Sequence, residues 1–149
     1  MIRGFKNGGW RFWFHPLFIL TEMSKIERYC KLIEEKTGEN VFDCARPSIF
    51  GNPYTHIKDK KTKALYIVKD REEAIALYDP YFDAALASDD EFVQKFREAF
   101  DEMYEMYKKH GEIFLGCYCK PEQTCHCDVI RKKLLRRSML EKLSHIRRQ

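Results

Sequence analysis

The sequence predicts one small α/β domain built on a mostly parallel sheet that is covered by helices. Its 149 residues suit a single domain, and 44% of them are hydrophobic, so the chain can bury a core of its own. Short apolar segments alternate with segments of helical periodicity along the chain. Strands separated by helices need crossover connections, which favour parallel pairing.

The first helix is expected over residues 24–36, where apolar side chains recur at helical spacing and Gly38 follows as a C-cap. Residues 40–45 and 65–68 are short and apolar, and they are predicted to be strands. A loop rich in proline and glycine and then a charged, exposed excursion separate these two strands.

A second helix is expected to start at Asp70, whose side chain forms a capping box with Glu73. Pro80 interrupts this helix, which resumes through Leu86 with a kink, because proline is tolerated at a new first helical position.

A second capping box, formed by Ser88 and Glu91, predicts the next helix, which ends at Gly111. Residues 112–119 follow as a central strand, and the last helix begins near Cys125 or His126. The predicted order is therefore helix, strand, loop, strand, helix, helix, strand, helix.

Residues 1–22 differ from the rest and are predicted to be an extension outside the domain, which covers residues 23–149. The extension is aromatic and basic, and Arg11, His15 and Pro16 interrupt its apolar run, so it does not fit a membrane span. It does not fit a signal peptide either, because no small-residue cleavage site follows. Met23 is the expected natural start. The alternative is an arm that packs its aromatic side chains on the domain or on a partner.

Composition and charge argue against several classes of protein. With 34% charged and 14% aromatic residues, the chain fits neither a disordered tail nor a membrane protein. The net charge of +4 is uneven: residues 1–22 carry +2 and residues 128–149 carry +6, which leaves −4 for the remainder. This layout predicts a solvated basic helix rather than a nucleic-acid binder.

The cysteines indicate a reduced protein. Four of the six lie within eleven residues, at Cys117, Cys119, Cys125 and Cys127. Pairs this close in sequence are poorly placed for ordinary disulfide bonds. We therefore expect free thiols and a cytoplasmic location.

The first candidate site is the segment 117–127, where a strand ends and a helix begins. Ligands of open α/β sheets bind at this edge, and the start of a helix favours an anion and lowers the pKa of a thiol such as Cys125. His126 can donate or accept a proton near neutral pH, so the pair suits nucleophilic or acid–base chemistry. The alternative, strongest for Cys117, is that these cysteines are packing groups.

The same segment holds a set of zinc ligands, Cys117, Cys119, Cys125 and Cys127. Their spacing argues against zinc, because Cys-x-Cys is tighter than usual and helical residues two apart point about 200° away from each other. Cys125 and Cys127 converge only if the backbone there is not yet helical. We expect no cofactor, with zinc as the alternative.

The second candidate site is the loop 46–53, of sequence RPSIFGNP. Two prolines stiffen it, and Gly51 permits a positive φ or a close backbone approach. Arg46 offers two parallel donors to phosphate or carboxylate, and Phe50 either stacks on a base or fills the core. The expected ligand-binding residues of the loop are Arg46, Ser48, Phe50, Gly51, Asn52 and Pro53. The alternative is an ordered turn without function.

The RPSxFGNP loop, followed by DREEAIALY and by a late CxC, five residues and CHxDVI, resembles a small family of domains of unknown function from phage and bacterial genomes. The resemblance spans residues 40–136 and implies a Rossmann-like fold but no established reaction. The matching motif positions are Arg46, Gly51, Asn52, Pro53, Cys119, Cys125, His126 and Asp128. Family members have a small residue where this chain has Cys127, which weakens a functional role for that cysteine and the four-cysteine zinc site.

We expect the two segments to lie side by side at the C-terminal edge of the sheet and to bind a small phosphorylated ligand, a nucleotide or a nucleotide-derived metabolite. A guanidinium, a glycine-bearing loop and a helix start suit phosphate, while Phe50 or Tyr54 would cover a base. Cys119 and Asp128 complete the expected ligand-binding set.

If the protein is an enzyme, we expect hydrolase or transferase chemistry. Cys125 would be the nucleophile, His126 the acid–base, Arg46 the group that stabilises a phosphate or oxyanion, and Asn52 an orienting residue.

Two other functions remain as alternatives. One is a zinc-stabilised, non-catalytic module that engages a protein or nucleic acid through its basic C-terminal helix; the other is an inhibitor that sequesters a nucleotide. Nucleic acid is the less favoured partner, and no membrane partner is expected.

Overall fold

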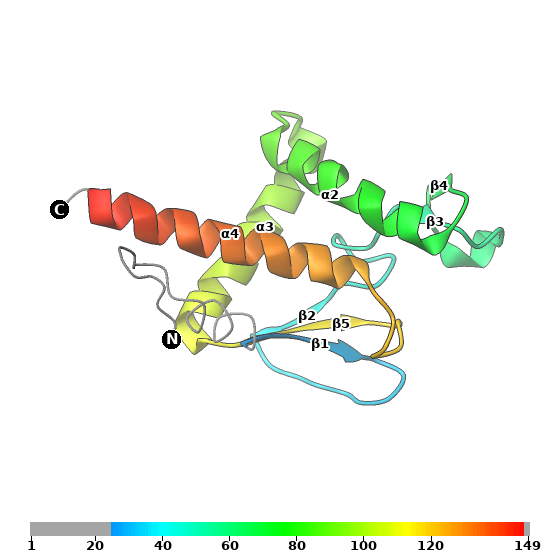
Figure 1. Ribbon diagram of the computed structural model, residues 1–149, viewed down its shortest axis with the longest axis horizontal. Helices are drawn as coiled ribbons and strands as arrows, with labels where there is room; N and C mark the ends of the chain where they lie inside the picture. Colours follow the sequence, from blue (N-terminus) through cyan, green and yellow to red (C-terminus); the bar gives the residue numbers. More distant parts are fainter. Residues whose placement is uncertain (1–24, 148–149) are drawn as a thin grey trace, which may run out of the picture.

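The computed structural model describes residues 25–147, and the predicted extension over residues 1–22 lies outside them. The elements in chain order are β1 (Ile26–Cys30), β2 (Val41–Asp43), β3 (Tyr54–Thr55), the 3-10 helix η1 (Lys60–Thr62), β4 (Tyr66–Ile67), α2 (Arg71–Ala87), α3 (Glu91–His110), β5 (Ile113–Cys117) and α4 (His126–Arg147). Figure 1 shows their arrangement as an α/β fold.

A three-stranded sheet of order β1-β5-β2 forms the base of the fold, and both of its strand pairs are parallel. The apolar strand β5 is central, as predicted. Cys30 pairs in register with Cys117, and Asp43 pairs with Gly116, so the three strands end at one edge. This confirms the predicted parallel sheet and gives it a single C-terminal edge.

The three α-helices within residues 25–147, α2, α3 and α4, lie on one side of the sheet (Figure 1). α4 packs on β1 and β5, α3 packs on β5, and α2 packs on both helices. Their shared core is strongly aromatic: the ring of Phe82 meets those of Phe96 and Phe100 edge to face, with centroids 4.8 and 5.1 Å apart. These large buried rings join α2 to α3 above the sheet.

The opposite face of the sheet carries no helix among the described residues, and side chains cover it instead. The ring of Tyr29 lies over Gly116, where an added Cβ would come within 2.8 Å of the tyrosine. The ammonium of Lys36 sits 4.4 Å from the centroid of the Phe114 ring. Tyr29 of β1 and Lys36 of the β1–β2 connection thus cover part of this face.

The helix predicted over residues 24–36 is wrong, because this segment contains β1. Ile26 and Cys30 are buried where they pair with β5, whereas Ile33 is 69% exposed, so the apolar spacing does not mark a helical face. This segment forms a strand because it pairs with β5, far along the chain, and local periodicity carries no information about that pairing.

The predicted strand at residues 65–68 exists, but it lies outside the main sheet. β4 pairs in parallel with β3 to form a separate two-stranded ribbon. Both residues of β4 are exposed. The ribbon lies beside the start of α2, near the edge at which the main strands end (Figure 1).

The N-cap predicted at Asp70 is confirmed, while the Glu73 side chain bonds to the residue before the cap instead of to the cap itself. Asp70 accepts a hydrogen bond from the backbone N–H of Glu73 at 2.8 Å, and Glu73 in turn accepts from the N–H of Lys69 at 3.0 Å. Pro80 does not divide the helix, which runs unbroken from residue 71 to 87. The favourable packing of α2 on both neighbouring helices compensates for the hydrogen bond that proline cannot make.

The second predicted capping box is wrong. Ser88 is the C-cap of α2, and its hydroxyl accepts from the N–H of Asp90 in the turn between the helices. α3 runs from Glu91 to His110 and is followed, as predicted, by Gly111, whose φ of +73° suits a residue without a side chain. None of the helices in residues 25–147 is long and apolar enough to cross a bilayer.

Candidate functional site

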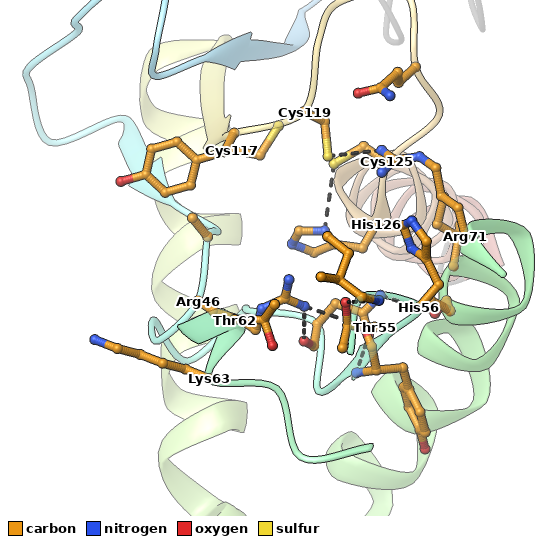
Figure 2. Close-up of a pocket in the computed structure, with 18 of the residues that line it drawn as sticks. Arg46, Thr55, His56, Thr62, Lys63, Arg71, Cys117, Cys119, Cys125 and His126 are labelled. Atoms are coloured by element: carbon orange, nitrogen blue, oxygen red, sulfur yellow. Dashed lines mark hydrogen bonds between the residues drawn. The ribbon is translucent and has the colours of Figure 1, made fainter. Parts of the chain in front are cut away.

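A cavity of about 470 Å³ opens at the C-terminal edge of the sheet (Figure 2). Its lining residues come from four places: residues 45–57, residues 61–63, the first turns of α2, and residues 117–126. Ligands of parallel α/β sheets bind at this edge because the strand ends leave a crevice there.

Six of the candidate residues line this cavity together: Arg46, Asn52, Cys117, Cys119, Cys125 and His126. The two candidate segments, distant in sequence, therefore share one cavity. Their chemical roles stay predictions.

The remaining candidates do not line the cavity: Ser48, Phe50, Gly51, Pro53, Cys127 and Asp128. Phe50 is a core residue, buried against Phe82 and edge to face with Phe96, and so it cannot cover a base. Of the two roles left open for this ring, filling the core is the one the structure shows.

Gly51 acts through the backbone. A Cβ at this position would lie 2.9 Å from Cα and 3.1 Å from the backbone nitrogen of Arg46, so only glycine lets the loop close on itself. Its φ is not positive, which leaves the close approach as the reason for glycine.

Arg46 is half-buried and held by its own loop. Its Nη1 donates to the carbonyl oxygens of Asn52 at 2.7 Å and Tyr54 at 3.3 Å. Burial lowers the pKa of Arg46, but no nearby carboxylate neutralises it among the described residues. The guanidinium therefore presents a positive charge to the cavity.

Asn52 positions the loop. Its Nδ2 donates to the carbonyl oxygen of Ala74 in α2 at 3.0 Å, and its Oδ1 accepts from the N–H of Tyr54 at 3.0 Å. Both the nitrogen and the oxygen of this buried amide form hydrogen bonds, so Asn52 joins the loop to α2. This holds in place the Asn52 carbonyl oxygen that binds Arg46.

The start of α4 is closed by its own residues. Cys125 is the residue before the helix, and its N–H donates to Oδ2 of Asp128 at 3.0 Å. Its Sγ accepts from the N–H of Cys127 at 3.5 Å. The carboxylate of Asp128 thus takes the position at the helix start that was predicted for the ligand, and Asp128 is a capping residue.

His126 is oriented by two contacts. Its Nε2 lies 2.6 Å from the carbonyl oxygen of Cys44, and because a carbonyl only accepts, Nε2 carries the proton in the neutral ring. Nδ1 then faces Sγ of Cys125 at 3.5 Å. The ring also packs edge to face with Tyr78, at 5.0 Å between centroids. This arrangement allows His126 to accept a proton from the thiol.

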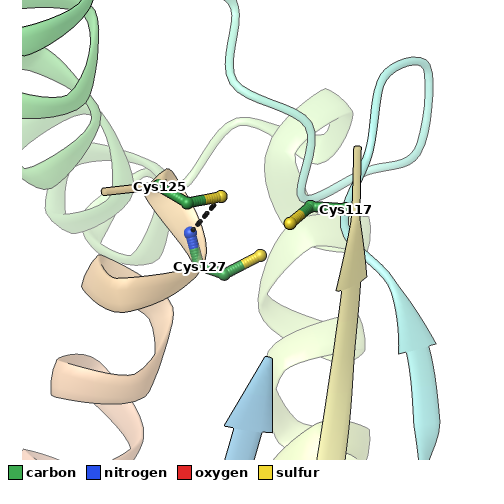
Figure 3. A group of neighbouring side chains, drawn as sticks. All are labelled: Cys117, Cys125 and Cys127. Carbon is green, nitrogen blue, oxygen red and sulfur yellow. Dashed lines mark hydrogen bonds between the residues drawn. The ribbon is translucent and has the colours of Figure 1, made fainter. Parts of the chain in front are cut away.

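The thiols of Cys117, Cys125 and Cys127 lie within 4.8 Å of one another (Figure 3). Cys125 precedes the helix, so the argument that two residues in one helix must point apart does not apply. Hydrogen bonds, first from Cys117, lower the pKa of the Cys125 thiol, while hydrogen bonding to Cys117 raises the pKa of Cys127. These hydrogen bonds favour the thiolate form of Cys125.

Arg71 is an important residue that the sequence analysis missed. Its Nη2 donates to Sγ of Cys119 at 3.0 Å and to the carbonyl oxygen of Thr124 at 2.5 Å, while Nε is buried without a hydrogen-bond partner among the described residues. An arginine directly after the predicted helix cap Asp70 was the available signal.

The charged segment at residues 56–63 also contributes to the site, although no site residue was predicted in it. His56, Lys61 and Lys63 line the cavity, because the β3–β4 ribbon turns this segment back toward the sheet edge (Figure 2). A run of positive charge between two short strands was the signal.

The described residues that line the cavity include two arginines, two lysines and two histidines. No Asp or Glu is among these described lining residues. Such a lining concentrates positive potential in a partly enclosed space. The arrangement can bind an anion, and it offers a thiol and an imidazole beside it.

A family model described as domain of unknown function (DUF4326) matches residues 29–136. The chain is a member of the DUF4326 family. The match begins within β1 and includes both candidate segments, so it confirms the family resemblance and extends it toward the N-terminus. No curated protein and no solved structure matches the chain.

Proposed function

We propose that this DUF4326 domain binds a small phosphorylated molecule in the cavity, with a nucleotide or nucleotide-derived metabolite as the best candidate. The single observation that carries the proposal is the charge of the lining. Arg46, Lys61, Lys63 and Arg71 line the cavity, no lining carboxylate opposes them among the described residues, and none of the four forms an ion pair in residues 25–147.

The donors of Arg46 and Arg71 suit a phosphate group. Arg46 and Arg71 both keep guanidinium N–H groups outside their loop contacts, and guanidinium groups bind phosphate oxygens through paired hydrogen bonds. The buried Nε of Arg71, which lacks a partner among the described residues, is costly unless an acceptor reaches it. A phosphate oxygen supplies that acceptor.

The size and the aromatic rim support a nucleotide. A volume of about 470 Å³ lies within the range of small-molecule sites. Tyr54 and Tyr118 both line the cavity, and an aromatic ring offers a stacking surface to a base. Of the two rings predicted to cover a base, Phe50 and Tyr54, only Tyr54 lines the cavity.

The proposal is tested by calorimetric titration with pyrophosphate, AMP and ATP. We expect Arg46→Gln to weaken binding by about 10- to 100-fold, the value of a charged hydrogen bond. A Lys61→Gln, Lys63→Asn double variant should lose about threefold, since exposed charges contribute less. Asn tolerates the positive φ of 61° at position 63.

Lys58→Gln is the matched control, because this exposed lysine belongs to the same segment and does not line the cavity. Equal affinity of wild type and both cavity variants, or no heat with any of the three probes, contradicts the proposal. Recovery of the bound probe after incubation separates a sequestering protein, which returns it intact, from a hydrolase or transferase.

A further inference from the structure

Three buried cysteines, Cys117, Cys125 and Cys127, form a cluster at the wall of the cavity. Cys117 comes from the end of β5, while Cys125 and Cys127 come from the start of α4, and their three sulfur atoms point toward one another (Figure 3). Each of the three is at most 1% exposed. A buried thiol of this kind is poorly placed to attack a substrate.

Their spacing suits a shared metal ion. Two thiolates bound to one zinc ion at about 2.3 Å lie about 3.8 Å apart in a tetrahedral site. The three thiols already lie within 4.8 Å of one another, so small side-chain movements bring them to that distance. Cys119 lies outside this group of three, but its thiol is a hydrogen-bonding neighbour of those of Cys117 and Cys125, and it is the candidate for the fourth ligand.

The charges around the cluster are complementary to a zinc–thiolate group. Zinc with four thiolates carries a net charge of −2, which needs two positive partners. Arg71 donates to Sγ of Cys119 at 3.0 Å, and the guanidinium of Arg28 lies beside the thiol of Cys125. Nη1 of Arg28 is buried without a partner among the described residues and gains an acceptor when Cys125 is a thiolate.

We propose that Cys117, Cys119, Cys125 and Cys127 bind one zinc ion, each thiol releasing its proton on binding. The N–H of Cys127, 3.5 Å from Sγ of Cys125, donates to a ligand thiolate. Zinc here anchors the end of β5 to the start of α4 and occupies Cys125 as a ligand. Because the family resemblance has a small residue at position 127, the complete four-cysteine site is a feature of this chain.

The test measures metal content and coordination in the full-length protein, purified under reducing conditions. We expect about one zinc per chain. After removal of the metal, cobalt(II) should give the intense sulfur-to-metal charge-transfer bands of a tetrahedral tetrathiolate site. Cys127→Ser should lower zinc affinity at least about 100-fold, as measured by competition with a chromophoric chelator.

Cys30→Ser is the matched control, since Cys30 is a buried cysteine outside the cluster, and it should keep wild-type zinc affinity. A folded, reduced wild type that holds no zinc and shows no cobalt–thiolate bands overturns the proposal, and so does a folded Cys127→Ser variant that binds zinc as tightly as wild type. If Cys127→Ser does not fold, the cobalt spectrum of the wild type decides. Phosphate binding is measured separately with Arg46→Gln, so either proposal can fail alone.

Discussion

Gly51 controls the position of Arg46 through its lack of a side chain. We expect Gly51→Ala to lower the free energy of unfolding by about 1–3 kcal/mol, because the added methyl meets backbone atoms of Arg46 that cannot move aside. Denaturant unfolding measures this change. The same variant should bind pyrophosphate more weakly, since Arg46 must shift.

Gly111→Asn serves as the control for this prediction. Its φ is +73°, which asparagine tolerates, and an added Cβ meets nothing within 4 Å. We expect a change below about 0.5 kcal/mol, in keeping with an exposed position. A Gly51→Ala protein as stable as this control would show that the loop is not tightly closed.

Asp128 holds the thiol-bearing turn in place. Its removal in Asp128→Ala leaves the N–H of Cys125 without its acceptor and deprives Arg131 of a partner 3.3 Å away. We expect a loss of about 1 kcal/mol in unfolding free energy, the usual value of a helix cap. Asp128→Asn should lose less, because an amide oxygen still accepts; equal losses in both variants would contradict the capping role.

Among the elements, α2 and α4 are joined by a largely buried lysine. Lys133 of α4 forms ion pairs with Asp79 and, at 2.9 Å, with Asp83, both on α2. We expect Lys133→Met to lower the unfolding free energy by about 2 kcal/mol at neutral pH, since two carboxylates lose a charged donor. Exposed Lys132→Met, which removes a 3.0 Å contact to Asp79, should lose less than about 1 kcal/mol.

The same contact gives a pH dependence. Hydrogen bonds from Lys133, and then from Lys132, lower the pKa of Asp79 in the folded protein. Its stabilising contribution is therefore complete above the pKa of the unfolded carboxyl, about 4, and is lost as the pH falls through the lower folded value. Acid unfolding curves of Lys133→Met should show a weaker dependence below about pH 4 than those of wild type.

The contact between α3 and α4 gives a pH dependence of stability in the opposite direction, with a loss at high pH. Burial and then the hydrogen bond to Glu141 raise the pKa of Tyr104 to about 12. Since the unfolded phenol ionises near pH 10, the contribution of Tyr104 is full below about pH 10 and is lost as the pH rises toward 12. Tyr104→Phe should remove this alkaline loss; an unchanged alkaline unfolding curve would contradict the assignment.

For the whole molecule, the elements that are built locally were predictable from the sequence. The N-cap at Asp70, the glycine at residue 111 and the apolar strand β5 each carry their own signal within a few residues. β1 was not predictable in this way, because its five residues become a strand only by pairing with β5 nearly ninety positions later.

Some residues of the candidate site were likewise predictable from local sequence, and others depend on long-range pairing. Loop and thiol segments were recognisable from residue type, and the crossover topology placed them at one edge, where they share a cavity. Lys61 and Lys63 were missed because the β3–β4 ribbon depends on pairing that leaves no periodic pattern in two-residue strands. Asp128 caps α4, and its predicted ligand role stays a prediction, because a carboxylate at a helix start suits a cap and a ligand site equally.

The structure of the protein crystallised with saturating ADP is the strongest test of whether the basic cavity holds phosphate. We predict that the phosphates lie in the cavity within hydrogen-bond distance of Arg46 and Arg71. An empty cavity under these conditions, or ADP bound only elsewhere on the surface, would contradict the account.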